Sequence, residues 1–407
     1  MHTETKAILE SNQGRDPERL KMKLAAIRAD PFAFFRGTCP LFYDTLRLDR
    51  SLLSSPLVLA CGDLHLENFA SYKGDNRLVY FDINDFDESC VAPLAFDLVR
   101  FVTSILVAAK PLKISDKKAM EMIAAFLETY AATIKSTKPR WVERSIATGP
   151  VKSLLQSVKG RHRGDLIEER TVRKSGKRRL KIDGEKTLAV SSKDRAQAES
   201  ILAAYASIQR APAFFEPIDI AKRIAGNGSL GLERYVALVR GTGKADGQYL
   251  VDIKFSVASS LVEHTRARQP AWKSEAERAS SIQLIAQAIP PALLGSIGVG
   301  GRAYLIKELE PTADRLDLAK LRGKSGMLVD VVRTMAQITA WAHLRSCGRL
   351  GSASVEDIAT FAARDGWRKQ ITKRASVSAA LALQQWQNYS ADYDADPDHL
   401  LPAARPT

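Results

Sequence analysis

The hydrophobic pattern of the chain mixes short apolar runs, typical of strands, with longer periodic stretches, typical of helices. The run Leu57–Ala60 predicts a buried strand that ends at a polar loop of residues 62–68. Residues 69–72 and 78–81 predict a hairpin, because turn residues separate these two β-rich runs. Helices are expected at residues 16–28, 95–109, 116–135, 194–209, 274–287, 327–345, 355–363 and 375–389. The sequence therefore predicts an α+β fold.

A glycine-rich loop follows residue 224 and contains Gly226, Gly228, Ser229 and Gly231. Two β-rich runs, residues 235–239 and 249–253, come next. A dinucleotide-binding fold needs a helix directly after such glycines, so the pattern favours the phosphate-covering loop of kinases. The alternative is a plain antiparallel hairpin.

Lys254 ends the second of these runs and shares a strand face with Asp252, because side chains alternate along a strand. We expect Lys254 and the glycine-rich loop to hold the phosphates of a nucleotide. The carboxylate that pairs with Lys254 stays open among three residues of the following segment, namely Glu263, Glu275 and Glu277.

Acidic and amide side chains stand at both ends of the predicted hairpin at residues 69–81. Asp63 and Asn68 precede the hairpin, and Asp82 and Asp85 follow it, so the turn brings the two groups together. Carboxylates that converge repel one another and favour a bound cation. Oxygen ligands of this kind suit Mg²⁺ completed by substrate phosphates. We expect Asp63 to accept a hydroxyl proton, and Asn68 with Asp82 or Asp85 to hold Mg²⁺.

The strings GDLHLEN at residues 62–68, DFD at 85–87 and FDL at 96–98 resemble the catalytic and metal motifs of aminoglycoside and choline phosphotransferases. By this resemblance His65 belongs to the catalytic motif, and Asp97 braces the catalytic loop from below. The strings PFAFFRG at 31–37, CGDLHLENF and FDINDFDE resemble more closely a bacterial family catalogued as domain of unknown function 2252, which is thought to be kinase-like. The resemblance implies a two-lobed protein-kinase-like fold, with ATP and Mg²⁺ as cofactors and a small-molecule alcohol as phosphate acceptor.

The order of the motifs is reversed relative to kinase-like enzymes, because Asp63 precedes the glycine-rich loop. We therefore expect a circularly permuted fold. Residues 1–222 then form a catalytic part with a basic insertion at about 150–190, residues 223–311 the nucleotide-binding lobe, and residues 312–407 the helical completion of the catalytic part.

The net charge of +14 raises the question of nucleic acid. Residues 152–186 hold twelve Lys and Arg against five Asp and Glu, but no aromatic residue for base stacking. A solvated hairpin or a site for an acidic substrate is therefore favoured over nucleic acid. The four cysteines are widely spaced, no apolar run reaches about 18 residues, and the start is polar, so we expect a cytoplasmic protein without a membrane span.

Two other functions remain open at this point. A catalytically decayed kinase-like binding or regulatory protein is the main alternative to an enzyme, and nucleic-acid binding through the basic segment is the third. The sequence identifies neither the acceptor nor the oligomeric state, and it does not distinguish phosphoryl transfer from adenylylation.

Overall fold

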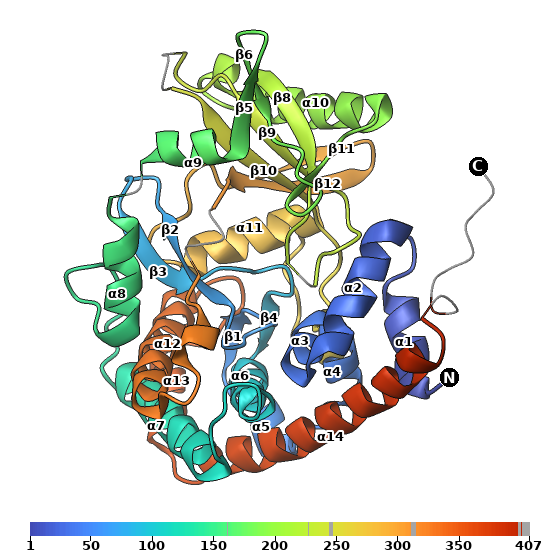
Figure 1. Ribbon diagram of the computed structural model, residues 1–407. Coiled ribbons are helices and arrows are strands. Elements are labelled where there is room, and N and C mark those ends of the chain that lie inside the picture. The colour runs from blue at the N-terminus through green and yellow to red at the C-terminus, as the bar shows by residue number, and fades with distance from the viewer. Residues whose placement is uncertain (161, 227, 244–246, 311–314, 398–399, 401–407) are drawn as a thin grey trace.

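The computed structural model describes residues 1–160, 162–226, 228–243, 247–310, 315–397 and 400 of the chain. Figure 1 shows a sheet-rich part at the top and most of the helices below it, so the fold is α+β, as expected. Arg161 of the basic segment, Asn227 of the glycine-rich loop and Pro311 at the expected lobe boundary lie outside the described residues.

The predicted elements are largely confirmed, with boundaries that differ by up to eight residues, as at the start of the last helix. The α-helices are α1 (Thr3–Ser11), α2 (Pro17–Ala29), α3 (Pro31–Gly37), α4 (Cys39–Thr45), α5 (Arg50–Leu53), α6 (Ala95–Ala108), α7 (Asp116–Lys135), α8 (Gly149–Val158), α9 (Arg163–Arg170), α10 (Ser192–Ser207), α11 (Glu275–Ala286), α12 (Ser325–Ser346), α13 (Val355–Ala363) and α14 (Trp367–Ala395). The strands are β1 (Leu57–Ala60), β2 (Phe69–Lys73), β3 (Val79–Ile83), β4 (Cys90–Pro93), β5 (Thr171–Lys174), β6 (Lys177–Leu180), β7 (Thr187–Leu188), β8 (Pro217–Arg223), β9 (Arg234–Val239), β10 (Tyr249–Phe255), β11 (Gly295–Val299) and β12 (Arg302–Glu308).

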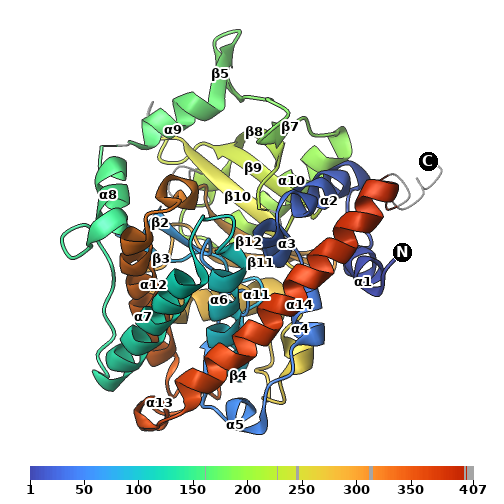
Figure 2. The same cartoon turned by 60° about the horizontal axis from the view of Figure 1, so that its bottom comes forward.

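The lower part is built around β1 and helices α6, α7 and α12, which share one large apolar core. Almost every residue of α6 is buried, because apolar side chains occupy nearly its whole circumference. β1 pairs antiparallel with β4, and β2 with β3 as the predicted hairpin. Figure 2 shows α14 crossing beside α6 and closing this part of the molecule. The polar loop after β1 is therefore anchored on a rigid base.

The upper part contains an antiparallel six-stranded sheet in the order β11-β12-β10-β9-β8-β7. Helix α10 packs on one face of this sheet. On the other face, Ile167 of α9 and Leu180 of β6 pack against Val236 and Leu250. The sheet thus begins at Thr187, and β7 and all of β8 but its last residue, Arg223, lie within the segment 1–222 of the sequence-based division.

The basic segment is therefore not a purely solvated hairpin. Its tip, from Arg173 to Lys177, is exposed, but its base covers the sheet. Among the described helices, none has the length and hydropathy that a membrane crossing would require.

Candidate functional site

The loop after β1 is held from below by Asp97. The backbone N–H groups of Cys61 and Gly62 donate to the Asp97 carboxylate at 2.8 and 2.9 Å. His343 of α12 contacts the same carboxylate through Nε2 at 3.1 Å, and Tyr130 through Nδ1 at 2.8 Å. The expected bracing role of Asp97 is confirmed, and His343 is a packed, hydrogen-bonded residue of the core.

Asp63, which is partly exposed, forms an ion pair with the fully buried Arg100 of α6. Arg100 donates to Asp63 Oδ1 from Nη2 at 2.7 Å and from Nε at 3.0 Å. Its guanidinium also lies 3.7 Å from the ring centroid of Phe35. The sequence analysis gave Arg100 no role, although an arginine inside an apolar helix is costly unless it is paired. That cost is the signal by which the residue could have been found.

His65 is buried beside Asp63. Its Nδ1 accepts a hydrogen bond from Glu67 N at 3.1 Å, which leaves the proton of the neutral ring on Nε2. Nε2 lies 3.8 Å from Asp63 Oδ2. Burial, followed by the charge of Arg36, lowers the pKa of His65 well below its ordinary value. The ring is therefore a neutral neighbour of the free oxygen of Asp63.

Asn68 joins the loop after β1 to the segment after β3. Its Oδ1 accepts from Asp85 N at 2.9 Å, and its Nδ2 donates to Asp85 O at 3.1 Å and Asp63 O at 2.9 Å. The two ends of the hairpin thus meet, as the sequence analysis expected for Asp63, Asn68 and Asp85. The side chain of Asp85 is 55% exposed and lines the cavities described below.

Asp82 lies apart from this group. It is buried, accepts from Ile83 N at 2.8 Å, and lies near Arg345 of α12. Burial raises the pKa of Asp82 to about 6. The two residues are separated because Asp82 lies within β3, whereas Asp85 lies in the loop that follows the strand. Of the two metal ligands left open by the sequence, only Asp85 lies beside Asn68.

Lys254 of β10 reaches across to the acidic segment after β3. Its Nζ pairs with Asp87 and lies 3.5 Å from Asp85 Oδ2. Burial by itself would raise the pKa of Asp85. The positive charges of Lys254 and Lys307 have the larger combined effect, so the pKa of Asp85 lies below its ordinary value. Burial and then the charge of Asp85 raise the pKa of Asp87. One ammonium therefore faces two carboxylates.

Lys254 pairs with Asp85 and Asp87 rather than with any of the three candidate glutamates, Glu263, Glu275 and Glu277. The Glu277 carboxylate instead accepts a hydrogen bond from Lys273 N at 2.5 Å. It lies at the start of α11, where the helix dipole stabilises acidic side chains. Glu275 pairs with Arg278 at 2.7 Å. Asp87 of the DFD string is therefore the carboxylate that pairs most closely with Lys254, a role predicted for one of the glutamates.

The glycine-rich loop connects β8 to β9, and the N-terminal helices hold it by its carbonyl groups. Arg15 donates to Gly228 O at 2.8 Å and to Leu230 O at 2.6 Å. Lys23 of α2 donates to Gly228 O at 3.1 Å. Gly231 has a φ of +86°, and a Cβ there would lie 2.8 Å from the side chain of Arg15. The loop is thus fixed from the side of α2, a contact that the sequence did not predict.

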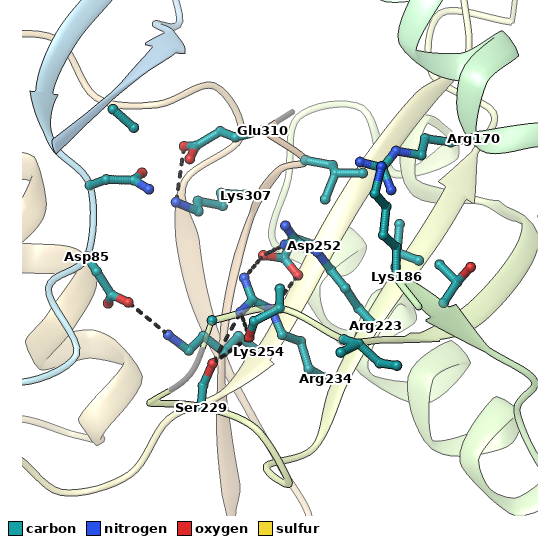
Figure 3. A pocket seen from close by; sticks show the side chains of 18 of the residues that line it. Asp85, Arg170, Lys186, Arg223, Ser229, Arg234, Asp252, Lys254, Lys307 and Glu310 are labelled. Carbon is teal, nitrogen blue, oxygen red and sulfur yellow. Dashed lines mark hydrogen bonds and ion pairs between the residues drawn. The ribbon is translucent and has the colours of Figure 1, made fainter. Parts of the chain in front are cut away.

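Two cavities meet at Asp85. The first, of about 520 Å³, lies under β8–β10 and is lined by Lys254 and Asp252, which share a strand face as expected (Figure 3). The second, of about 630 Å³, contains Asp63, His65 and Asn68. Residues that line both cavities are Asn84, Asp85, Gly226, Ser229 and Arg315. A group bound at Asp85 is therefore accessible from both sides.

The family model for an uncharacterized protein conserved in bacteria, DUF2252, matches residues 15–392 of the chain. The chain belongs to this family. Neither the curated proteins nor the solved structures gave a match. The DUF2252 match covers the loop after β1, the acidic segment after β3 and the glycine-rich loop, so the whole site belongs to the family domain.

A divalent metal at this DUF2252 site would have few protein ligands. Among the described residues, no three His, Cys, Asp or Glu side chains converge closely enough to hold an ion. Mg²⁺ commonly uses only one or two carboxylates and takes its other ligands from water and substrate phosphates. Asp85 and Asp87, which now share one ammonium, fit that mode of binding.

Proposed function

We propose that the protein is an ATP- and Mg²⁺-dependent phosphotransferase that transfers a phosphoryl group to a hydroxyl of a small molecule. One observation carries this proposal. Lys254, on the sheet with the glycine-rich loop, lies beside Asp85, which Asn68 ties to the loop of Asp63. A phosphate-binding lysine, an acidic metal ligand and a candidate base thus lie around one point, as phosphoryl transfer requires.

The nucleotide side is supported by the upper sheet. The glycine-rich loop joins β8 to β9, and Lys254 lies on the next strand, β10. Protein kinases place their glycine-rich loop and phosphate-binding lysine in this relationship. The cavity below the loop, of about 520 Å³, falls in the size range of cofactor sites. We infer that ATP binds there with its phosphates toward Lys254.

The acceptor side is supported by the second cavity. Arg100 donates its hydrogen bonds to Oδ1 of Asp63 from the core side, whereas Oδ2 lies 3.8 Å from His65 Nε2. An acceptor hydroxyl in this cavity can donate its proton to Asp63 Oδ2 as it attacks the phosphorus atom. Mg²⁺ at Asp85 would neutralise phosphate charge during the transfer.

The proposed circular permutation is supported by α12. This helix comes late in the sequence, yet the chain that leaves it returns to β1, where Ala353 N donates to Leu57 O at 2.8 Å. His343 of α12 contacts Asp97 beneath the loop of Asp63. The segment after α12 therefore lies beside the start of β1, although it comes much later in the sequence. This is the arrangement expected if α12 led into β1, which is the order of these elements in kinase-like enzymes.

Thermal unfolding with Mg·ATP, with and without excess chelator, tests the binding part of this proposal. We expect stabilisation that depends on the metal, of about 2.7 kcal/mol at a hundredfold excess over Kd. Equal stabilisation with chelator would contradict the metal-dependent mode. ATP hydrolysis, compared between the native protein and D63N, then separates an enzyme from a binding protein, because a binding protein would show the same slow rate in both.

A further inference from the structure

The cavity under β8–β10 has an excess of positive charge at its far end. In the middle of the cavity, Arg223 and Arg234 both pair with the Asp252 carboxylate, and Arg234 does so at 2.5 Å. At the cavity mouth, Arg170 and Lys186 share Glu169 at 3.4 and 3.6 Å. In each cluster, two cations therefore share one carboxylate.

Figure 3 shows that the cluster of Arg170 and Lys186 lies away from the proposed phosphate-binding end. Asp85 and Lys254 stand on one side of the cavity, and Arg170 and Lys186 stand on the opposite side. Lys181 and Asp183 also line the cavity near Lys186, which brings the charged side chains of the far end to three cations, Arg170, Lys181 and Lys186, and two carboxylates, Glu169 and Asp183.

Backbone hydrogen bonds hold the turn that carries Lys186, whose side chain is 46% exposed. Oδ1 of Asp183 accepts from the backbone N–H groups of Glu185, Lys186 and Thr187 at 3.0, 2.7 and 3.0 Å, which fixes the turn that carries Lys186. Arg170 ends α9, and its side chain is only 14% exposed. Its Nε is buried and lies 3.4 Å from Glu169 Oε1, and it makes no hydrogen bond among the described residues. A buried donor without an acceptor costs free energy unless a ligand supplies one.

The two ends of the cavity therefore differ in what they lack. At Lys254, two carboxylates pair directly with one ammonium, and Lys307 and Arg234 add positive charge from farther away, so phosphates with a metal ion at Asp85 are the ligand that this end suits. At Arg170, two cations share one carboxylate, and only an anion would relieve that imbalance. We propose that the ligand of this cavity carries a second anionic group at the end remote from Lys254, which on a nucleotide is a phosphate on the ribose. This inference rests on the proposed function, because the triphosphate at Lys254 sets the direction of the nucleotide.

Calorimetric titration with AMP, adenosine 2′,5′-bisphosphate and adenosine 3′,5′-bisphosphate at fixed ionic strength tests the inference. We expect at least one bisphosphate to bind about tenfold or more tightly than AMP, since one charge-assisted contact is worth about that factor. The double variant R170A/K186A should reduce this preference to less than about twofold. K174A/K177A is the matched control, because it removes two positive charges from the exposed hairpin tip and none from the cavity.

Equal binding of AMP and both bisphosphates by the native protein would overturn the inference. So would an equal loss of the preference in K174A/K177A, since this would indicate general attraction to the basic segment. The outcome is separable from that of the proposed function. A preference for a bisphosphate without any binding of Mg·ATP would sustain the second anion site and contradict the phosphotransferase. Metal-dependent binding of Mg·ATP without a preference for a bisphosphate would sustain the phosphotransferase and contradict the second anion site.

Discussion

Arg100 donates two hydrogen bonds to a single oxygen of Asp63, from a side chain with 0% exposure. The pair connects the core helix α6 to the loop that carries the proposed base. Removal of either partner leaves the other as an uncompensated charge, and in buried pairs this costs about 3–5 kcal/mol. Asp63 therefore has a structural role in addition to its proposed chemical role, and the two have to be separated by experiment.

For D63N we expect ATP turnover to fall about 10²–10⁴-fold while Mg·ATP binding changes little. The reason is that the amide keeps the shape of the side chain but does not accept a proton. The unfolding midpoint should also fall, because Arg100 loses its counter-charge. D44N is the control, since Asp44 lines the same cavity and its carboxylate is 55% exposed and contacts His264 at 3.1 Å. Equal turnover in D63N and the native protein would contradict the role of Asp63 as base.

For K254M we expect Mg·ATP affinity to fall while unfolding stays cooperative. Lys254 contacts Asp85 and Asp87 rather than the apolar core, so its main contribution is to the ligand. An ATP-derived acyl phosphate should acylate Lys254, and free ATP should protect it. K320M is the control, because Lys320 is 82% exposed and lies outside the first cavity. Protection of a lysine in the basic segment instead of Lys254 would move the phosphate site there and argue against the permuted arrangement.

For R15A we expect faster hydrogen exchange in the glycine-rich loop and about tenfold weaker Mg·ATP binding. Arg15 donates to two loop carbonyls, and each hydrogen bond contributes about 0.5–1.5 kcal/mol. R47A is a matched control, because Arg47 also donates to two carbonyls, Asp44 O and Leu46 O, but within its own loop. Unchanged exchange in residues 228–232 of R15A would show that the loop does not depend on this contact.

Gly62 has no room for a side chain. Its φ is +83°, and a Cβ would lie 2.1 Å from the backbone oxygen of Glu88. We expect G62A to destabilise the protein well beyond the roughly 1–2 kcal/mol of a left-handed alanine. G176A is the control, because Gly176 has a φ of +74° with nothing within 4 Å of a Cβ. Similar urea midpoints for the two variants would contradict this account.

Burial raises the pKa of Glu88 to about 7, although Ser260 N and Oγ donate to its carboxylate at 2.6 and 2.8 Å. The folded protein therefore binds this proton more tightly than the unfolded chain, so stability falls as pH rises from about 4.5 to about 7 and is level above. E88Q lacks this titration. We expect the native protein to lose roughly 1–3 kcal/mol relative to E88Q between pH 5 and pH 8, measured by urea unfolding. Parallel stability curves would contradict the shifted pKa.

Much of the site is visible in the sequence because its residues stand close together along the chain. Asp63, Asn68 and Asp85 flank one hairpin, and a hairpin brings its ends together whatever the rest of the fold does. Strand alternation likewise places Asp252 and Lys254 on one face. Local periodicity and turn chemistry determine such features, so they need no knowledge of distant contacts.

The remaining contacts join segments that are far apart in sequence. The pair of Arg100 with Asp63 depends on how α6 packs against β1 within the lower part. The pair of Lys254 with Asp87 and the contact of Arg15 with Gly228 depend on how the lower part packs against the upper sheet. The sequence offered three glutamates for Lys254, and the tertiary structure selects none of them. By itself, the sequence determined the elements and the acidic hairpin, because periodicity and turn residues act locally. Only the tertiary structure decided which charges face one another, because packing of the apolar cores brings those segments together, and the cost of burying a charge requires each one to be paired.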